Sequence, residues 1–272
     1  MSAVCFGTLP IFGKVAYAEG LNVQSLLAFR FLLAAAILSV YVLARRTALP
    51  RGRSLAGLVV MGGVGYVLQS AAYFNSIRYV PAAVTSVLLY TYPAIVAVAS
   101  WPLYRARLTR SRTFALVLAL AGVALVSNPG GGLRWEGIVL GLLAAVTYSF
   151  YILLGKSVLR GVDPVAATAV VVGSAGLAYL AISLASGSLL MPRSMTAMGA
   201  VVGIAVVATV VAAAAFLAGL SRTDPGHASL ISTLEPLSTA LLAFIVLGQA
   251  LTPLQLLGGI LVVGAVVLVA RG

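Results

Sequence analysis

The sequence predicts an all-α integral membrane protein in which ten transmembrane helices form two inverted five-helix repeats, with both termini in the cytoplasm. Three observations predict this fold class: an apolar composition, an uneven distribution of basic residues and an internal repeat. Of the 272 residues, 62% are hydrophobic and 8% are charged. A soluble domain has roughly 45–50% apolar and about 25% charged residues, so this composition excludes a water-soluble fold.

The apolar residues fall into ten segments that we expect to be membrane-spanning helices. About 20 apolar residues cross the hydrocarbon core, so a span with its connection takes roughly 25 residues. Short connections containing Pro, Gly or Arg separate the segments. The expected helices cover approximately residues 2–18, 23–44, 55–77, 82–104, 113–128, 136–156, 163–186, 196–219, 226–247 and 253–270.

The basic residues predict the orientation of these helices. Counted over alternate loops, twelve Lys and Arg residues fall on one side of the membrane and three, Arg78, Arg134 and Arg193, on the other. The positive-inside rule makes the richer side cytoplasmic. Because the arginines cluster in short loops, as topology signals do, the net charge of +12 does not indicate a nucleic-acid partner.

The chain also repeats itself at an offset of 143 residues. This offset places Pro93 on Pro236 and Leu108-Thr109 on Leu251-Thr252. Each repeat holds five spans, and because five is odd, the second repeat must enter the membrane upside down. We expect a first repeat at residues 1–128, a linker at 129–135 and a second repeat at 136–272.

The loop charges agree with inversion. Residues 105–112 contain four arginines, whereas the aligned residues 248–255 contain no charge. Equivalent loops with opposite charge bias lie on opposite sides of the membrane. Inverted repeats of this kind are typical of secondary transporters, which bind substrate near the midplane between the two halves.

Several segments resemble EamA-type members of the drug/metabolite transporter superfamily. The matching segments are Phe29-Arg30-Phe31-Leu32-Leu33-Ala34, Leu234-Glu235-Pro236, residues 247–252 and residues 255–259. The chain departs from the family pattern at Gln249, where a glutamate is common, and at Tyr90-Thr91-Tyr92-Pro93, where Leu-Glu-Pro is typical. Its aromatic first half is most similar to the YddG-type amino-acid exporters. The resemblance implies export of aromatic and other amino acids across a bacterial inner membrane.

Two prolines are candidate hinges. Pro93 and Pro236 are repeat-related and interrupt the fourth and ninth segments. Proline removes a backbone hydrogen bond and frees a carbonyl one turn earlier, and matched interruptions point to a transporter's binding site. The freed carbonyls can accept a hydrogen bond from a substrate ammonium group. The alternative is a kink that serves packing only.

Tyrosine and glutamine side chains are the candidate substrate-binding groups. Tyr66, Gln69 and Tyr73 recur at i, i+3 and i+7, so they share one helix face, which should avoid lipid and line a central cavity. The alternative is hydrogen bonding across packed helices or a place in the interfacial aromatic belt. Further candidates are Tyr90, Tyr148 and Trp101, of which Trp101 is also suited to anchor the fourth helix at the interface.

Three ionisable residues lie within the expected spans. Glu235 is the acidic residue well inside a span, where it can carry a proton or form an ion pair with Arg30 or Lys14 that braces the fold. Arg30 is expected to act in bracing. Lys14, near a membrane face, is expected to extend its ammonium group to the interface.

Small residues complete these expectations. Gly137 and Gly141, like Gly199 and Gly203, have the spacing that lets helices approach closely.

The sequence argues against an enzyme, a channel and a cofactor protein. His227 is the single histidine and five acids are scattered along the chain, so a Ser–His pair in the membrane or a metal cluster is not expected. No charged ring or selectivity-filter repeat is visible. A monomer surrounded by lipid is expected, and a dimer stays open. Drugs, nucleosides, other small metabolites and lipid-linked compounds remain alternative substrates.

Overall fold

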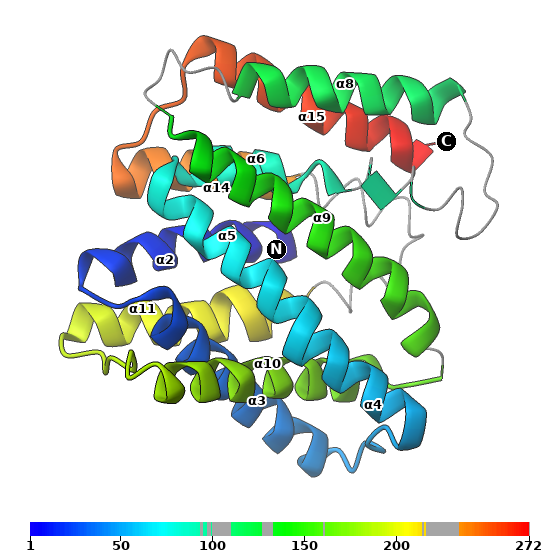
Figure 1. Cartoon of the computed structure of the whole chain (residues 1–272), viewed down its shortest axis with the longest axis vertical. Coiled ribbons are helices and arrows are strands. Elements are labelled where there is room, and N and C mark those ends of the chain that lie inside the picture. The colour runs from blue at the N-terminus through cyan, green and yellow to red at the C-terminus, as the bar shows by residue number, and fades with distance from the viewer. Residues whose placement is uncertain are drawn as a thin grey trace.

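The computed structural model describes residues 1–92, 95–96, 99, 110–126, 133–159, 161–213, 215 and 234–271, and these residues contain helices and no strand. Figure 1 shows the helices running roughly parallel and antiparallel to one another. The elements are α1 (Ser2–Gly7), α2 (Leu9–Ala18), α3 (Val23–Ala44), α4 (Gly52–Val60), η1 (Met61–Tyr66), α5 (Val67–Tyr79), α6 (Ala82–Leu89), α8 (Arg110–Val126), α9 (Trp135–Val158), α10 (Pro164–Ala185), α11 (Met195–Ala205), η3 (Val206–Val211), α14 (Leu234–Leu247) and α15 (Pro253–Arg271).

The helices agree with the expected apolar segments. Four are long and apolar enough to cross a membrane: Val23–Ala44, Gly52–Tyr79, Trp135–Gly155 and Pro164–Ala185. Shorter apolar helices fall in the other expected segments, so each of the ten overlaps a helix. The prediction of an all-helical, multi-pass membrane protein is therefore supported.

Polar side chains begin several of these helices. Asn22 accepts a hydrogen bond from the Ser25 amide at the start of α3, and Ser194 accepts one from the Ala197 amide at the start of α11. Asp163 does the same before α10, accepting from two amides. The first turn of a helix leaves its N–H groups without internal partners, and such side chains satisfy them.

Two helices contain a widened, π-helical turn that the sequence analysis did not predict. The third helix, Gly52–Tyr79, includes η1, and the eighth, Met195–Val211, includes η3. Hydroxyl groups bond to carbonyls beside both turns. Within the third helix the Ser70 hydroxyl donates to the Tyr66 carbonyl at 2.5 Å, and within the eighth the Thr209 hydroxyl donates to the Ile204 carbonyl at 2.8 Å. Lipid offers backbone groups no hydrogen bonds, so such internal partners let an irregular turn persist.

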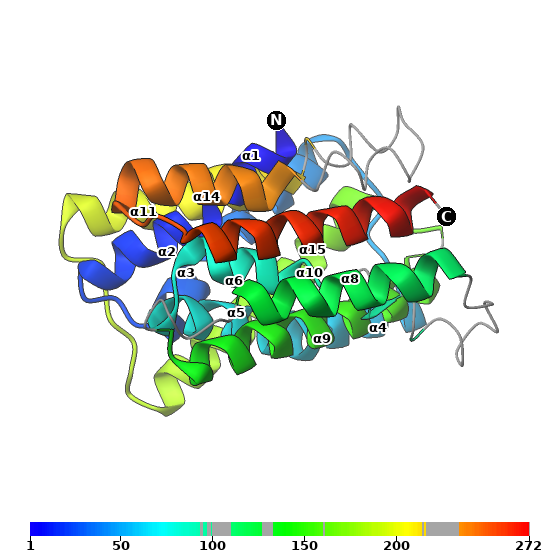
Figure 2. The same cartoon turned by 90° about the horizontal axis from the view of Figure 1, so that it is seen from above.

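The helices pack in a pattern that joins the first and second halves of the chain. Figure 1 shows α8 beside α15 at one edge and α3 beside α10 at the other, and Figure 2 shows α8 and α15 side by side from above. Between these edges α5 packs on α9, α2 on α11, and α6 on α14 and α9. In addition, α1 packs on α14, η1 on α10, and α3 on α11.

One crossing brings two backbones into direct contact. A Cβ atom added to Gly62 in η1 would lie 2.2 Å from the Val171 carbonyl oxygen of α10. No side chain fits between the helices there, so only glycine allows this approach. The glycines predicted to allow close packing mostly do so: added Cβ atoms at Gly137, Gly141 and Gly203 would meet neighbouring side chains within 3 Å. At Gly199 the prediction was wrong, because no atom of the described residues lies within 4 Å of an added Cβ atom.

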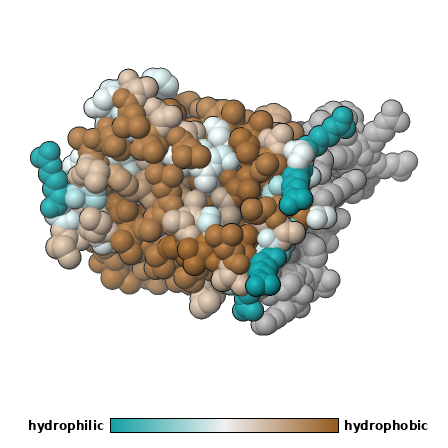
Figure 3. All heavy atoms as spheres, turned by 90° about the horizontal axis from the view of Figure 1, so that it is seen from below, coloured by the Kyte–Doolittle hydropathy of each residue, from teal (hydrophilic) through white to brown (hydrophobic). Residues whose placement is uncertain are grey.

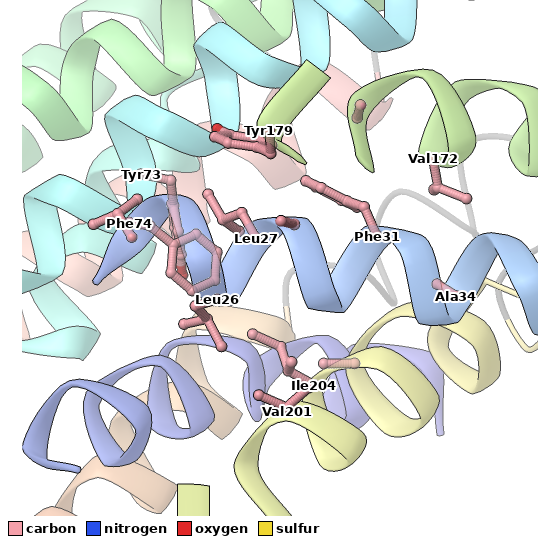
Figure 4. Close-up of a cluster of buried hydrophobic side chains, with 14 of the residues drawn as sticks. Leu26, Leu27, Phe31, Ala34, Tyr73, Phe74, Val172, Tyr179, Val201 and Ile204 are labelled. Atoms are coloured by element: carbon pink, nitrogen blue, oxygen red, sulfur yellow. The ribbon is translucent and has the colours of Figure 1, made fainter. Parts of the chain in front are cut away.

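The main core lies where α3 meets α5, α10 and α11. Figure 4 shows Leu26, Leu27 and Phe31 of α3 surrounded by side chains from these neighbours, including Tyr179 and Ile204. All are nearly or completely buried.

The outer surface is apolar, as a lipid-facing surface must be. Figure 3 shows a face that is mostly hydrophobic, with hydrophilic residues near its two ends. Exposed side chains on α9 include Leu143, Phe150 and Leu154, and on α14 they include Phe244 and Ile245. An apolar surface of this extent is suited to a membrane rather than to water.

Candidate functional site

Five tyrosines form a continuous row of ring contacts between the two halves of the chain. Ring centroids lie 5.8 Å apart between Tyr90 and Tyr92, 4.8 Å between Tyr92 and Tyr148, 6.0 Å between Tyr148 and Tyr151, and 5.8 Å between Tyr151 and Tyr66. These spacings are typical of attractive aromatic pairs. We call Tyr90, Tyr92, Tyr148, Tyr151 and Tyr66 the aromatic row.

Four members of the aromatic row keep accessible surface, whereas Tyr90 is buried. Two of the four, Tyr148 and Tyr151, come from α9, whose other side carries the exposed Phe150 and Leu154. Because Tyr148 contacts Tyr92 and Tyr151 contacts Tyr66, the row lies on the side of α9 that faces other helices. Hydroxyl-bearing rings with remaining accessible surface can contact a bound solute.

Glu235 lies at one end of the aromatic row. The Tyr90 hydroxyl donates to its carboxylate at 2.8 Å, which joins the end of α6 to α14. The carboxylate side chain is partly exposed. A carboxylate beside accessible tyrosine rings can bind an ammonium group or carry a proton.

Arg30 lies at the other end, where α3 approaches Tyr66. Its side chain is 2% exposed. The Nε atom donates to the Thr209 hydroxyl at 3.0 Å, and Nη2 donates to the Tyr66 hydroxyl at 3.4 Å. The guanidinium carbon also lies 4.7 Å from the centre of the Phe31 ring and 5.6 Å from that of Phe74, so aromatic faces contribute to holding the charge.

The expected ion pair of Glu235 with Arg30 or Lys14 is not formed. Among the described residues the salt bridge is Arg134–Glu136, at 2.7 Å on the surface. Glu235 is bound by Tyr90 instead, and the guanidinium of Arg30 is occupied by hydroxyls and aromatic faces. Lys14 lies on α2 with its side chain partly exposed.

The predicted face of the third helix divides into three environments. Tyr66 belongs to the aromatic row, while Tyr73 is 4% exposed and packs edge-on against Phe74 in the core. Gln69 is 7% exposed, and its amide has no hydrogen-bond partner in the part of the chain that the structure describes. Shared helical spacing therefore did not mean a shared environment.

The other candidates differ in how far the structure describes them. Pro236 is buried in the first turn of α14. Pro93 and Trp101 lie outside the described residues. Three residues of this region were not among the site residues predicted from the sequence: Tyr92, Tyr151 and Thr209. For Thr209 one signal was available, because the 143-residue offset aligns it with Tyr66.

The side chains of this region are of kinds that can bind a solute. Within the described residues no three His, Cys, Asp or Glu side chains come together as a metal site would require. The aromatic row offers ring faces and hydroxyls, with a carboxylate at one end and a guanidinium at the other. Such groups recognise an amphiphilic solute by stacking, hydrogen bonding and charge.

The fold and composition together define a multi-pass membrane protein. The sequence model of the EamA-like transporter family matches residues 1–128 and 135–271, and the chain belongs to this family. It is therefore a membrane transporter and not an enzyme.

Relatives of known sequence carry the same general description. An uncharacterized transporter of Archaeoglobus fulgidus is 28% identical over 100% of this chain and 94% of its own length. The uncharacterized transporter YcbK of Bacillus subtilis is 27% identical over 95% of this chain and 86% of its own length. A crystal structure superposes with a TM-score of 0.71 over 98% of this chain and 94% of that chain, at 19% identity, which shows a shared fold.

Proposed function

We propose that this transporter exports amino acids, aromatic and other, from the bacterial cytoplasm. It acts in the inner membrane as a monomer surrounded by lipid, by alternating access through a central cavity between its two halves. The observation that carries the proposal is the aromatic row, whose partly exposed tyrosine rings lie between a carboxylate and a guanidinium. These three kinds of group complement the side chain, ammonium and carboxylate of an amino acid.

The helix contacts support two inverted repeats at residues 1–128 and 136–272. If the two repeats are related by symmetry, each contact should have a counterpart in which every helix is replaced by its equivalent in the other repeat. The third helix packs on the sixth (α5–α9), and the equivalent eighth helix packs on the first (α11–α2). The contact of the second with the eighth (α3–α11) likewise becomes that of the seventh with the third (α10–η1). A two-fold relation of this kind lets the halves rock between inward-open and outward-open states.

Substrate recognition is assigned to residues of the aromatic row and its neighbours. Tyr66 and Tyr148 stack on apolar or aromatic side chains, and Glu235 with Tyr90 attracts the ammonium group. Gln69 supplies an amide that has no partner in the described chain. Tyr73 supports this surface from the core, Trp101 closes the cytoplasmic end, and Pro93 and Pro236 act as hinges.

Glu235 is assigned to proton coupling in preference to bracing the fold. Its carboxylate makes a hydrogen bond with one hydroxyl and no salt bridge within the described residues, so it is not fixed by an ion pair. A carboxylate in that situation can exchange a proton as its surroundings alternate between the two sides of the membrane.

Counterflow in proteoliposomes tests the proposed function. Vesicles are loaded with unlabelled amino acids, and labelled phenylalanine or methionine is added outside. Saturable accumulation of label supports an amino-acid carrier. No accumulation with any amino acid, from protein shown to be folded by size-exclusion chromatography, contradicts the substrate class. The same vesicles would then be loaded with drugs, nucleosides and lipid-linked compounds.

Two variants of α9 test the aromatic row within that assay. Tyr148→Ala removes a ring that contacts Tyr92 and Tyr151 and that is assigned to stack on the substrate. We expect the substrate concentration at half-saturation to rise about tenfold, because one aromatic contact with the substrate is lost. Phe150→Ala is the matched control, because its ring is 56% exposed on the lipid side. Equal effects of the two variants would contradict a role for the aromatic row in substrate binding.

Glu235→Gln tests the role in proton coupling. A glutamine keeps the size and the acceptor for Tyr90 but cannot take up or release a proton and carries no negative charge. We expect counterflow to persist with a higher half-saturation concentration, because the ammonium group loses a charged partner, and stimulation by an imposed pH gradient to disappear. Equal stimulation of wild type and variant would show that Glu235 is structural.

A further inference from the structure

Arg30 is a buried cation that no acidic side chain neutralises in the described part of the chain. Its side chain is 2% exposed, the salt bridge among these residues joins Arg134 to Glu136, and Glu235 is bound by Tyr90. Removing an unpaired charge from water is costly, so ionisable residues inside membrane proteins mark functional sites by default. Packing alone does not offset the free-energy cost of burying this charge.

The guanidinium is held by neutral groups, and some of its N–H donors make no hydrogen bond within the described residues. Its bond to the Thr209 hydroxyl is 3.0 Å long, whereas its bond to the Tyr66 hydroxyl is 3.4 Å and lies beyond the usual range for N–H···O bonds. A guanidinium has five N–H donors, and these two bonds use two of them. A carboxylate accepts two parallel N–H bonds from such a group, which together are stronger than bonds to hydroxyls.

Tyr66 lies between the guanidinium and the rest of the aromatic row. Its hydroxyl accepts from Arg30, while its ring contacts those of Tyr151, at 5.8 Å, and Phe31, at 4.9 Å. The Tyr66 side chain keeps accessible surface, whereas Arg30 has almost none. Displacement of the Tyr66 hydroxyl would therefore open Arg30 to whatever occupies the aromatic row.

The two hydroxyls that hold Arg30 belong to matched places in the two halves. Tyr66 is the last residue of η1, Thr209 lies in η3, and the 143-residue offset aligns them. Both lie in π-helical turns, which are frequent at functional sites. In this state Arg30 therefore links the third helix to the eighth.

We propose that Arg30 binds the carboxylate of the transported amino acid and that this carboxylate displaces the hydroxyls of Tyr66 and Thr209. The inference rests on the proposed function. Substrate binding then replaces a link between the two halves by a link between Arg30 and the substrate. Occupancy of the site and release of the third and eighth helices become one event.

Competition by phenylalanine analogues tests this proposal. Labelled phenylalanine counterflow is measured against phenylalanine, which has both charged groups, phenylalaninamide, which lacks the carboxylate, and 3-phenylpropionate, which lacks the ammonium group. We expect the amide to compete at least about tenfold more weakly than phenylalanine, since it loses a charge-assisted pair of hydrogen bonds. In Arg30→Gln this difference between acid and amide should vanish. Arg78→Gln is the control, because that arginine is exposed and bonds to Asn75.

The outcomes separate the inference from the proposed function. A folded Arg30→Gln variant that still prefers acid over amide as wild type does overturns the inference while amino-acid transport stands. If Arg30→Gln does not fold, the variant Tyr66→Phe with Thr209→Val decides. In this double variant the ratio by which phenylalanine competes better than phenylalaninamide should rise about threefold or more, because the competing hydroxyls are gone. An unchanged or lower ratio overturns the proposal.

A second readout covers the case in which wild type carries no amino acid. The proposed function then fails, and thermal stabilisation of the purified protein by 3-phenylpropionate is compared with stabilisation by its amide. A shift given by the acid alone, and lost in Arg30→Gln or Arg30→Lys, supports a carboxylate site at Arg30. Equal shifts with acid and amide overturn it.

Discussion

The third and eighth helices share a backbone irregularity but differ in the side chains around it. Both contain a six-residue π-helical turn, and both approach Arg30, the third through Tyr66 and the eighth through Thr209. Beyond the turn the third helix continues with Gln69 and Ser70, where the eighth has Ala212 and Ala213. The backbone geometry is therefore repeated in both halves, while the polar side chains that follow the turn are found in the third helix and not in the eighth.

The largest effect is expected where the third helix contacts α10. Gly62→Ala places a Cβ atom 2.2 Å from the Val171 carbonyl oxygen, so the helices must separate. Overpacking of this kind costs about 3 kcal/mol, and we expect a strongly lowered melting temperature or failure to fold.

Two controls belong to this variant. Gly63→Ala adds the same group with its nearest neighbour 4.0 Å away, and it should leave the melting temperature nearly unchanged. The eighth helix has Ala205 at the position aligned with Gly62, so the requirement for glycine is specific to the third helix. Equal behaviour of the two glycine variants would contradict the close backbone contact.

A smaller effect, on transport rather than folding, is expected at Gln69. Gln69→Leu keeps the side-chain volume but removes the amide, a group that has no counterpart at the aligned position of the eighth helix. We expect the rate of counterflow to fall roughly tenfold with little change in melting temperature. Leu68→Ala is the control, because Leu68 is 55% exposed on the lipid side. A fully active Gln69→Leu protein would show that the polar difference between the two helices has no role in recognition.

A still smaller effect is expected from the hydroxyl that supports the third helix from outside. The Tyr179 hydroxyl donates to the Val67 carbonyl at 2.8 Å, just beyond η1. Tyr179→Phe should lower the free energy of unfolding by about 1 kcal/mol, because the bonds of this hydroxyl to the Val67 carbonyl and to the Ser70 hydroxyl are lost. Ser183→Ala, one turn along α10, removes a buried hydroxyl that has no partner and should be neutral or stabilising. Thermal unfolding of both variants checks this order, and the reverse order would contradict it.

The smallest effect is expected in the eighth helix itself. A Cβ atom added to Gly199 would have no atom of the described chain within 4 Å, so Gly199→Ala should leave transport unchanged. Its melting temperature should stay equal or rise slightly, because alanine favours helix more than glycine does. Impaired counterflow would indicate a contact at Gly199 that forms only in another state of the cycle.

The sequence allowed the helices and part of the candidate site to be predicted, because both follow from local patterns. Apolar runs marked each helix, and helical spacing combined with the cost of burying polar groups selected Tyr66. Ring contacts between Tyr92 and Tyr148 depend on how the fourth and sixth helices pack, and no local pattern contains that information. The two π-helical turns also escaped prediction, since valine and glycine runs are equally compatible with a regular helix.

The charges illustrate the same limit. Opposite charge suggested that Glu235 pairs with Arg30 or Lys14, but attraction acts only between groups that the fold brings close. In the described part of the chain Glu235 accepts a hydrogen bond from a tyrosine hydroxyl, and Arg30 donates hydrogen bonds to two hydroxyls. The ionisable residues could be identified from the sequence, but their hydrogen-bond partners depend on how the helices pack.

The contact of Gly62 with Val171 also has a mechanical consequence. No side chain separates the two backbones there, so this is the point at which the two helices approach most directly. If the halves rock as proposed, this contact would serve as a fulcrum near the middle of the Gly52–Tyr79 helix, which spans 28 residues. A lever supported near its centre moves most at its two ends and in opposite directions. One small rotation there would narrow the path on one side of the membrane while widening it on the other.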